Sequence, residues 1–311
     1  GCCCLSSVVG RDVAGEIDSQ LVGSLANIFI VATRPAAHNH PAVDTMNNDR
    51  SAVLPASTQQ VILNTGNILG CKDLTKKVFQ SLGEELIQSL TLALVKWKSS
   101  GNDINCSDGK VLKYANKDLP CRVAIKERST LKITVKVFLS GFDAAALESA
   151  THKVLEELGV SELDSLIVAF PPSAKSSTEK VRPLWAAAEQ LYRQGLALSV
   201  GVSDLDTAQL RDLHSWAEVK PSVNQVNLES CCVIPQEMQE FAKANNIQLL
   251  THSDPKVLLD HEGMARLLKG YVAEEDICHW SAPWVARYSV LVKCRGFLQS
   301  KGYVASLVKE P

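Results

Sequence analysis

The sequence lacks a strong excess of charge of either sign, and it lacks long hydrophobic runs. Its 311 residues include 32 Lys and Arg against 34 Asp and Glu, which gives a formal net charge of -2. A balanced charge excludes the broad basic surface that binds nucleic acid by counterion release. The longest apolar runs, such as residues 166–170, are far shorter than the roughly 20 residues of a membrane-spanning helix. The sequence therefore predicts no nucleic-acid partner and no membrane partner.

Closely spaced cysteine pairs of the kind that bind zinc are also missing. None of the ten cysteines belongs to a C-x-x-C pair, so the sequence predicts no metal site and no thioredoxin-type site. The start of the chain has no basic segment followed by an apolar stretch and a small-residue cleavage site, as a signal peptide would. A chain of this length does not need disulfides to hold its core. We expect a reducing compartment, the cytoplasm, with most thiols free.

Residues 1–56 differ in composition from the rest of the chain. Residues 34–57 contain three prolines, two histidines and a polar run, and they have neither the helical nor the strand period. We interpret residues 1–56 as a poorly ordered N-terminal extension. Residues 57–311 are predicted to form one domain, because 46% of the chain is hydrophobic and suffices for a large core.

Short apolar runs alternate with helical patterns from residue 133 onward, which is typical of a parallel sheet covered by helices. With two earlier strands at 61–64 and 122–126, eight strands result, as in a (β/α)8 TIM barrel. Too few residues follow the strand at 122–126 for a crossover helix, so the barrel should be irregular in its first third. An open doubly wound sheet is the alternative, although no G-x-G-x-x-G motif follows the first strand. The six later predicted strands are 133–139, 166–170, 197–202, 223–226, 248–251 and 290–293.

The helices are predicted from apolar residues spaced three and four apart. Asp143 caps one helix that Gly159 ends, and Asp206 with Gln209 forms a capping box at the start of another. The polar segment 98–119 is interpreted as a solvated connector, with a partner-binding loop as the alternative. The predicted helices are 74–97, 143–159, 183–194, 206 onward, 236–244 and 256–269.

Several segments resemble known families. Residues 195–204 and 220–225 resemble strands five and six of the aldo-keto reductases, which are (β/α)8 barrels. A closer resemblance is to the modifier (regulatory) subunits of glutamate–cysteine ligase, a divergent branch with the same fold. It extends from about residue 57 to the end of the chain. The segments that carry it are 64–67, 163–168, 223–235, 247–255 and 287–293.

The resemblance implies that most catalytic groups of the reductases are missing. Those enzymes use a Tyr as general acid, assisted by Lys, Asp and His, with NADPH as hydride donor. Lys136 matches the lysine, Ala169 stands in place of the histidine, and no D-x-A-x-x-Y pattern lies between residues 121 and 134. We therefore predict no catalytic residue. Lys136 is a candidate relic of the catalytic lysine, and a simple ion-paired lysine at the barrel mouth is the alternative.

The residues that bind the cofactor in the reductases are partly kept. By the resemblance, Ser203 and Gln225 match the Ser and Gln that hold the nicotinamide amide, while Asp204 replaces an Asn. Lys293 is a weak match to the segment that holds the adenosine phosphate, with Cys294 in place of a Ser. No cofactor is therefore required, and residual NADP binding stays open.

Two neighbouring cysteines are candidates for contact with a partner. In the resembling subunits, a pair such as Cys231 and Cys232 is a candidate for a disulfide to the catalytic subunit; buried free thiols are the alternative. Cys294 is a further candidate. His252 and His279 have no second ligand at metal-binding spacing, which favours structural histidines. A last group of aromatic and basic residues is interpreted as part of the core, with a subunit interface as the alternative. These residues are Trp280, Trp284, Arg287 and Tyr288.

The resemblance predicts a non-catalytic regulatory subunit in glutathione biosynthesis. It implies a heterodimer with the catalytic subunit of glutamate–cysteine ligase. In this heterodimer the chain would raise the catalytic subunit's affinity for glutamate and its resistance to glutathione feedback inhibition. The chain has no Walker loop for ATP chemistry, so the ligase activity would belong to the partner. A divergent NADPH-dependent aldo-keto oxidoreductase is the main alternative, and a redox-sensing scaffold acting through Cys231 and Cys232 is a second.

Overall fold

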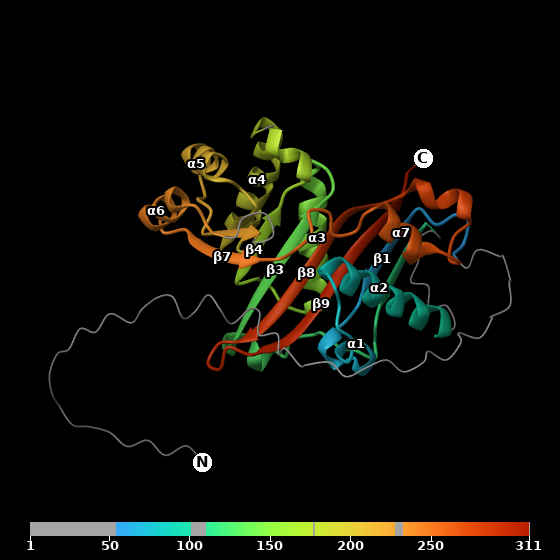
Figure 1. The fold of residues 1–311 in the computed structure, drawn as a ribbon. Coiled ribbons are helices and arrows are strands. Elements are labelled where there is room, and N and C mark those ends of the chain that lie inside the picture. The colour runs from blue at the N-terminus through green and yellow to red at the C-terminus, as the bar shows by residue number, and fades with distance from the viewer. Residues whose placement is uncertain (1–53, 101–109, 177, 228–232, 311) are drawn as a thin grey trace, which may run out of the picture. The chain divides into compact units, whose positions relative to one another are not determined.

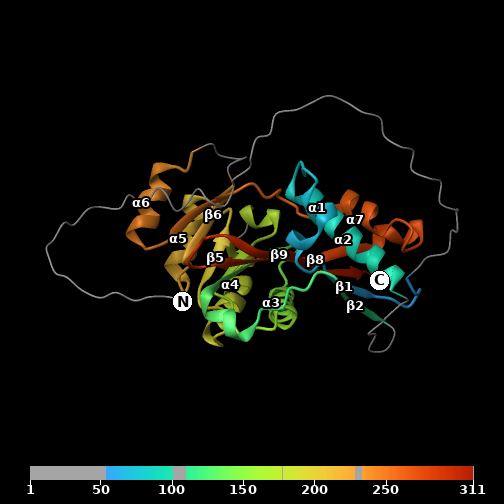
Figure 2. The same ribbon diagram turned by 90° about the horizontal axis from the view of Figure 1, so that it is seen from below.

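The computed structural model describes residues 54–100, 110–176, 178–227 and 233–310, and its fold is shown in Figures 1 and 2. Within these ranges a single sheet of nine strands runs in the order β2-β1-β9-β8-β3-β4-β5-β6-β7. The sequence predicted eight strands. The nine are β1 (Gln60–Asn64), β2 (Val111–Ala115), β3 (Leu131–Leu139), β4 (Ser165–Ala169), β5 (Val200–Ser203), β6 (Val223–Asn227), β7 (Gln248–His252), β8 (Trp280–Val292) and β9 (Leu298–Lys309).

The strands β3 to β7 are parallel neighbours and form one half of the sheet. Their apolar runs were predicted from the sequence, and the α/β class is confirmed. Strand β5 begins at Val200 because Ala197 only forms an isolated bridge with Leu163. Parallel strands end at the same edge of a sheet, so residues that follow β4, β5, β6 and β7 are brought together there.

The other half of the sheet is built on a long antiparallel hairpin. Strands β8 and β9 pair with each other and lie between β1 and β3. The sequence predicted only the end of β8, and it missed β9 and β2; the predicted strand at 122–126 is wrong, because that segment leads into a 3₁₀ helix, η3 (Ile125–Thr130). These strands were not predicted because they pair with partners far away in the chain. In addition, their residues do not alternate regularly between apolar and polar.

Helices cover both faces of the sheet, as Figures 1 and 2 show. One apolar core joins α3 (Ala144–Leu158) and α4 (Thr178–Arg193) to side chains such as Val135 and Val137. A second core lies on the opposite face, where α2 (Leu82–Ser99) and α7 (His261–Leu268) cover β1, β8 and β9. Along β3, side chains alternate between the faces, so Lys136 points away from the first core.

The helix ends follow local capping chemistry. Asp143 and the left-handed Gly159 bound α3, and Asp206 with Gln209 forms the predicted capping box of α5 (Thr207–Trp216). The predicted long helix at 74–97 is divided, because the Ser81 hydroxyl accepts from the Glu84 backbone N–H and starts α2 there. The remaining helices are the short α1 (Lys72–Thr75) and α6 (Gln236–Ala244). None of the helices in the described ranges is long and apolar enough to span a membrane.

Gly302 shows how closely the hairpin packs. It lies opposite Tyr288 on β8, and a Cβ atom at this position would collide with the backbone oxygen of Gly66 and with the Tyr288 phenol. Gly302→Ala should therefore lower the free energy of unfolding by about 1–3 kcal/mol, the usual range for overpacking a core. Urea denaturation measures this change.

Gly141→Ala is the matched control, since a Cβ atom there meets nothing within 4 Å. We expect it to change stability by less than about 0.5 kcal/mol. Equal effects of the two substitutions would contradict the packing described for the hairpin.

Candidate functional site

A cluster of buried charged and polar side chains lies where the parallel strands end. Lys136 is on β3, Ser203 ends β5, His252 ends β7 and Asp254 lies two residues after the end of β7. Arg287 on β8 is the register partner of Lys136. The first four residues are less than 9% exposed. The shared edge of the parallel strands brings these side chains together from positions more than 100 residues apart.

Asp254 is the centre of this cluster. Its carboxylate accepts from Lys136 Nζ at 2.7 Å and from two guanidinium nitrogens of Arg287 at 2.5 and 3.0 Å. His252 Nδ1 lies 3.2 Å from the same carboxylate. Asn227 Nδ2 donates to the Asp254 backbone oxygen at 2.7 Å. A carboxylate that is 2% exposed is stable only because two cations and further donors compensate for its lost hydration.

The electrostatics keep Asp254 ionised. Burial alone would raise the pKa of its carboxyl, but the His252 hydrogen bond and the nearby charges of Arg287 and Lys136 hold this pKa far below the usual range. Burial lowers the pKa of Lys136 to about 8, against the opposing attraction of Asp254. Lys136 therefore keeps its proton at neutral pH and stays paired.

The Ser203 hydroxyl is fully engaged by its neighbours. It accepts from Lys136 Nζ at 2.8 Å, donates to Asp204 Oδ2 at 2.9 Å and lies 3.2 Å from His252 Nε2. His252 Nε2 also contacts Asp204 Oδ1 at 3.1 Å. Asp204 has a φ of 64°, in the left-handed region, and its N–H donates to the Gln225 oxygen. The turn after β5 thus holds the Asp204 carboxylate beside His252.

The contacts from Ser203 to His252 to Asp254 have the order of a nucleophilic triad, but the hydrogen bonds oppose that chemistry. In such a triad the base nitrogen faces the serine while the acid accepts from Nδ1–H. Here Nε2 also faces the Asp204 carboxylate at 3.1 Å, and this contact favours a proton on the nitrogen that would have to act as the base. The Ser203 side chain also accepts from Lys136 and is 3% exposed. The cluster is a neutralised ionic network.

The reductase general acid has no replacement in this cluster. Tyr303 lies across from Arg287 on β9, but its hydroxyl donates to Glu85 on α2 at 2.5 Å. Burial raises the pKa of Tyr303 well above its ordinary value, whereas a general-acid tyrosine needs a lowered pKa. Lys301 Nζ also contacts Glu85, at 2.6 Å. This second network joins α2 to the hairpin.

The predicted cofactor residues fit a nicotinamide poorly. Ser203 and Gln225 are register partners on β5 and β6. The Ser203 hydroxyl is already occupied, and Asp204 can only accept where the reductase Asn also donates. Gln225 Oε1 is buried without a hydrogen-bond partner in the described residues, so it alone of the three groups is left to accept from an amide. The residues therefore fit the nicotinamide amide only in part, because Ser203 and Asp204 do not offer what the reductase pattern supplies.

The structure separates the other predicted site residues from this cluster. Lys293 lies at the opposite end of the sheet, where its backbone N–H donates to the Thr130 oxygen and its ammonium is 3.4 Å from Asp164. Cys294 follows it as an exposed thiol in the β8–β9 turn. Cys231 and Cys232 lie outside the described residues, so their role at an interface stays a prediction.

The remaining candidates belong to the core or the surface. Trp280, Trp284 and Tyr288 are at most 5% exposed and pack in the two cores, on strand β8 rather than on a helix. His279 is exposed. Among the described residues, no group of three His, Cys, Asp or Glu side chains is placed to bind a metal ion. His252 is buried within the charge cluster, as a structural histidine.

Sequence reasoning missed the centre of the site. It did not single out Asp254, and it considered Arg287 only as a core or interface residue. One available signal was that Asp254, like Ser203 and Asp204, lies within three residues of the end of a predicted parallel strand. The pairing with Arg287 had no such signal, because it depends on the placement of β8 beside β3.

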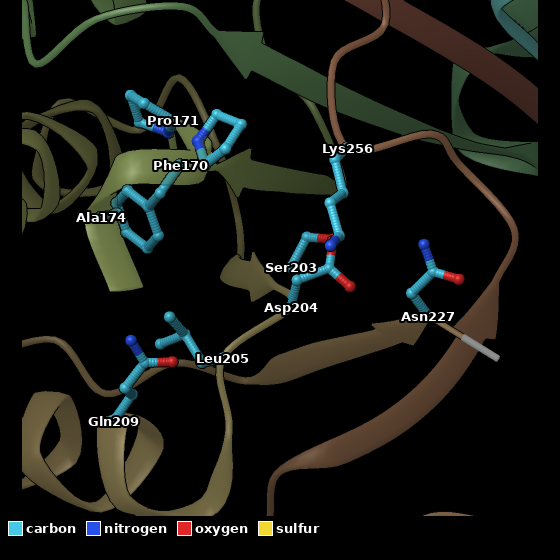
Figure 3. A pocket seen from close by; sticks show the side chains of 10 residues that line it. Phe170, Pro171, Ala174, Ser203, Asp204, Leu205, Gln209, Asn227 and Lys256 are labelled. Carbon is cyan, nitrogen blue, oxygen red and sulfur yellow. The ribbon is translucent and has the colours of Figure 1, made fainter. Parts of the chain in front are cut away.

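Two adjoining cavities lie beside the cluster. The first has a volume of about 220 Å³ and is enclosed by residues from the ends of β4 to β7, drawn in Figure 3. The second, of about 130 Å³, lies over Phe138 and Asp254. Phe170, Pro172, Asp204 and Lys256 line both cavities.

Part of the chain is similar to the aldo-keto reductases. The aldo/keto reductase family pattern matches residues 111–254, which contain β2 to β7 and most of the cluster. An aldo-keto reductase of Arabidopsis thaliana is 31% identical over 163 residues, 49% of each chain.

Other relatives match almost along their whole length. The glutamate–cysteine ligase regulatory subunit of Mus musculus is 37% identical over 259 residues, which are 82% of this chain and 94% of that protein. The regulatory subunit of Homo sapiens is 37% identical over 256 residues, with 81% and 93% covered. The chain belongs to the family of glutamate–cysteine ligase regulatory subunits.

Removal of Asp254 should be costly, because it leaves Lys136 and Arg287 buried without their counter-ion. We expect Asp254→Ala to lower the free energy of unfolding by about 3–5 kcal/mol. Asp118→Ala is the control, since the Lys96–Asp118 pair is solvent-exposed and should contribute less than about 1 kcal/mol. Urea denaturation compares the two; a small loss for Asp254→Ala would show that the buried network is not a main source of stability.

His252 should make stability depend on pH. Burial would lower its pKa, but hydrogen bonds to Asp204 and Asp254 raise the pKa above the ordinary value. Its stabilising contribution is then complete below the unfolded pKa of about 6.5 and is lost as pH rises through the higher folded value. The stability difference between wild type and His252→Gln should therefore shrink as pH rises.

Chemical denaturation from about pH 6 to pH 9 measures this difference. The exposed His261→Gln substitution is the matched control. A difference that stays constant or grows with pH would show that His252 is not held charged by its two carboxylate partners.

Proposed function

We propose that the chain is a non-catalytic regulatory subunit that binds the catalytic subunit of glutamate–cysteine ligase. Its effect is to raise the catalytic subunit's affinity for glutamate and its resistance to glutathione inhibition. The surroundings of Lys136 are the observation that carries the non-catalytic part of the proposal. Its ammonium contacts Asp254 at 2.7 Å and Ser203 at 2.8 Å, while the hydroxyl of the nearby Tyr303 donates to Glu85.

The regulatory part of the proposal is supported by relatives that are 37% identical and are named glutamate–cysteine ligase regulatory subunits. The mechanism is a coupling free energy between the subunit interface and the glutamate site of the partner. Typical couplings of ~1–3 kcal/mol change affinity about 5- to 150-fold. The chain contributes binding surface, and the chemistry takes place on the partner. No cofactor is required for this role.

Co-purification with the glutamate–cysteine ligase catalytic subunit, followed by glutamate kinetics, tests the proposal. The complex should survive gel filtration, and the glutamate KM of the catalytic subunit should fall about 5-fold or more. The experiment is repeated with glutathione present, where the complex should keep more activity than the catalytic subunit alone. Unchanged kinetics would overturn the proposal.

An assay with NADPH separates this function from a divergent oxidoreductase. The folded chain and Lys136→Met are each mixed with NADPH and a panel of carbonyl compounds. No oxidation of NADPH is expected, because no tyrosine in the described ranges is hydrogen-bonded to Lys136 and the Tyr303 hydroxyl donates to Glu85. Hydride transfer that disappears in a folded Lys136→Met protein would show that reductase chemistry persists.

A further inference from the structure

The two cavities at the ends of the parallel strands have opposite charges on their common boundary. Asp204 and Lys256 line both cavities, and in Figure 3 the Lys256 side chain extends toward the Asp204 carboxylate. No ion pair within 4 Å joins these two residues in the described part of the chain. An acceptor and a donor of opposite charge thus face the same space without neutralising each other directly.

The Asp204 carboxylate is fixed in place and still accessible. His252 and Ser203 hold it at 3.1 and 2.9 Å, and its side chain is 41% exposed. These contacts are hydrogen bonds to fixed strand ends, so the carboxylate does not need to be ordered when a ligand binds. A carboxylate of this kind, with lone pairs left for a ligand, is suited to an ammonium group.

Two donors line the first cavity. Lys256 contributes an exposed ammonium. Gln209 lines the same cavity, and its Oε1 is occupied by the Asp206 backbone N–H in the capping box. The orientation of the Gln209 amide is therefore set, and its Nε2 group remains to donate. An ammonium and an amide donor together suit a carboxylate.

Apart from Ser203 and Asn227 in the first cavity and Ser140 and Asp254 in the second, the rest of the lining is apolar. Phe170, Pro171 and Leu205 form a wall of the first cavity (Figure 3), and Phe138 and Leu258 belong to the second. An apolar side chain of a ligand would gain by burial against either wall.

We propose that these cavities bind a small zwitterion with an apolar side chain, that is, a free amino acid or a short peptide. Its ammonium contacts Asp204, its carboxylate contacts Lys256 and Gln209, and its side chain packs against Phe170. A simple anion is opposed by Asp204, and a simple cation is opposed by Lys256. The proposal stands on these contacts and does not depend on the regulatory function.

Calorimetric titration with L-leucine tests the site. L-Leucinamide lacks the carboxylate and N-acetyl-L-leucine lacks the ammonium, so each should bind at least about tenfold more weakly than L-leucine. Glycine, which has no side chain to pack against Phe170, should also bind more weakly. Equal binding of L-leucine and the two blocked compounds would overturn the proposal, as would no heat of binding up to about 10 mM L-leucine.

Two substitutions locate the site. Asp204→Asn suits the positive φ of this residue and removes the charge, and Lys256→Met changes an exposed side chain. Each should weaken L-leucine binding at least about tenfold. Lys126→Met is the control, because Lys126 is exposed and lies before the start of β3. The cavities lie at the other end of the parallel strands. If Lys126→Met weakens binding as much as Lys256→Met, the ligand does not occupy these cavities.

Discussion

The buried carboxylate of Asp254, paired with Lys136 and Arg287, is the interaction on which the centre of this structure depends. A charge without hydration is tolerated only next to opposite charge and hydrogen-bond donors, and β3, β8 and the segment after β7 each supply one member of the group. The pairing therefore constrains how the antiparallel hairpin lies against the parallel strands. Arg287 continues the network, since its register partner Tyr303 contacts Glu85 on α2.

The same interaction sets the surroundings of the lysine that matches the reductase lysine. A lysine that assists a general acid needs a tyrosine beside it. In this chain, Lys136 is paired with Asp254, Ala169 stands where a histidine would, and Tyr303 donates to Glu85. The cavities beside the cluster persist, although the groups that face them are Asp204 and Lys256.

Local patterns predicted those parts of the fold that depend on neighbouring residues. The apolar runs of β3, β4, β6 and β7 and the caps at Asp143, Gly159 and Asp206 were found because burial on both faces and capping leave a signature within a few positions. Lys136 and Ser203 were found through resemblance. Strands β2 and β9 were missed because their partners are distant in the chain, and Asp254 was missed because an acidic residue after a strand has many ordinary explanations.

By itself, then, the sequence determined the α/β class, the family and the absence of the reductase histidine, since all three can be read from residues in order along the chain. Only the tertiary structure decided that Lys136 is neutralised, that Lys293 lies far from Ser203, and that Asp204 and Lys256 face shared cavities. These outcomes depend on strand order and register, which arise from pairing between segments that lie far apart in the chain. Buried ion pairs form only after such pairing is complete, so their physical cause lies in the folded molecule.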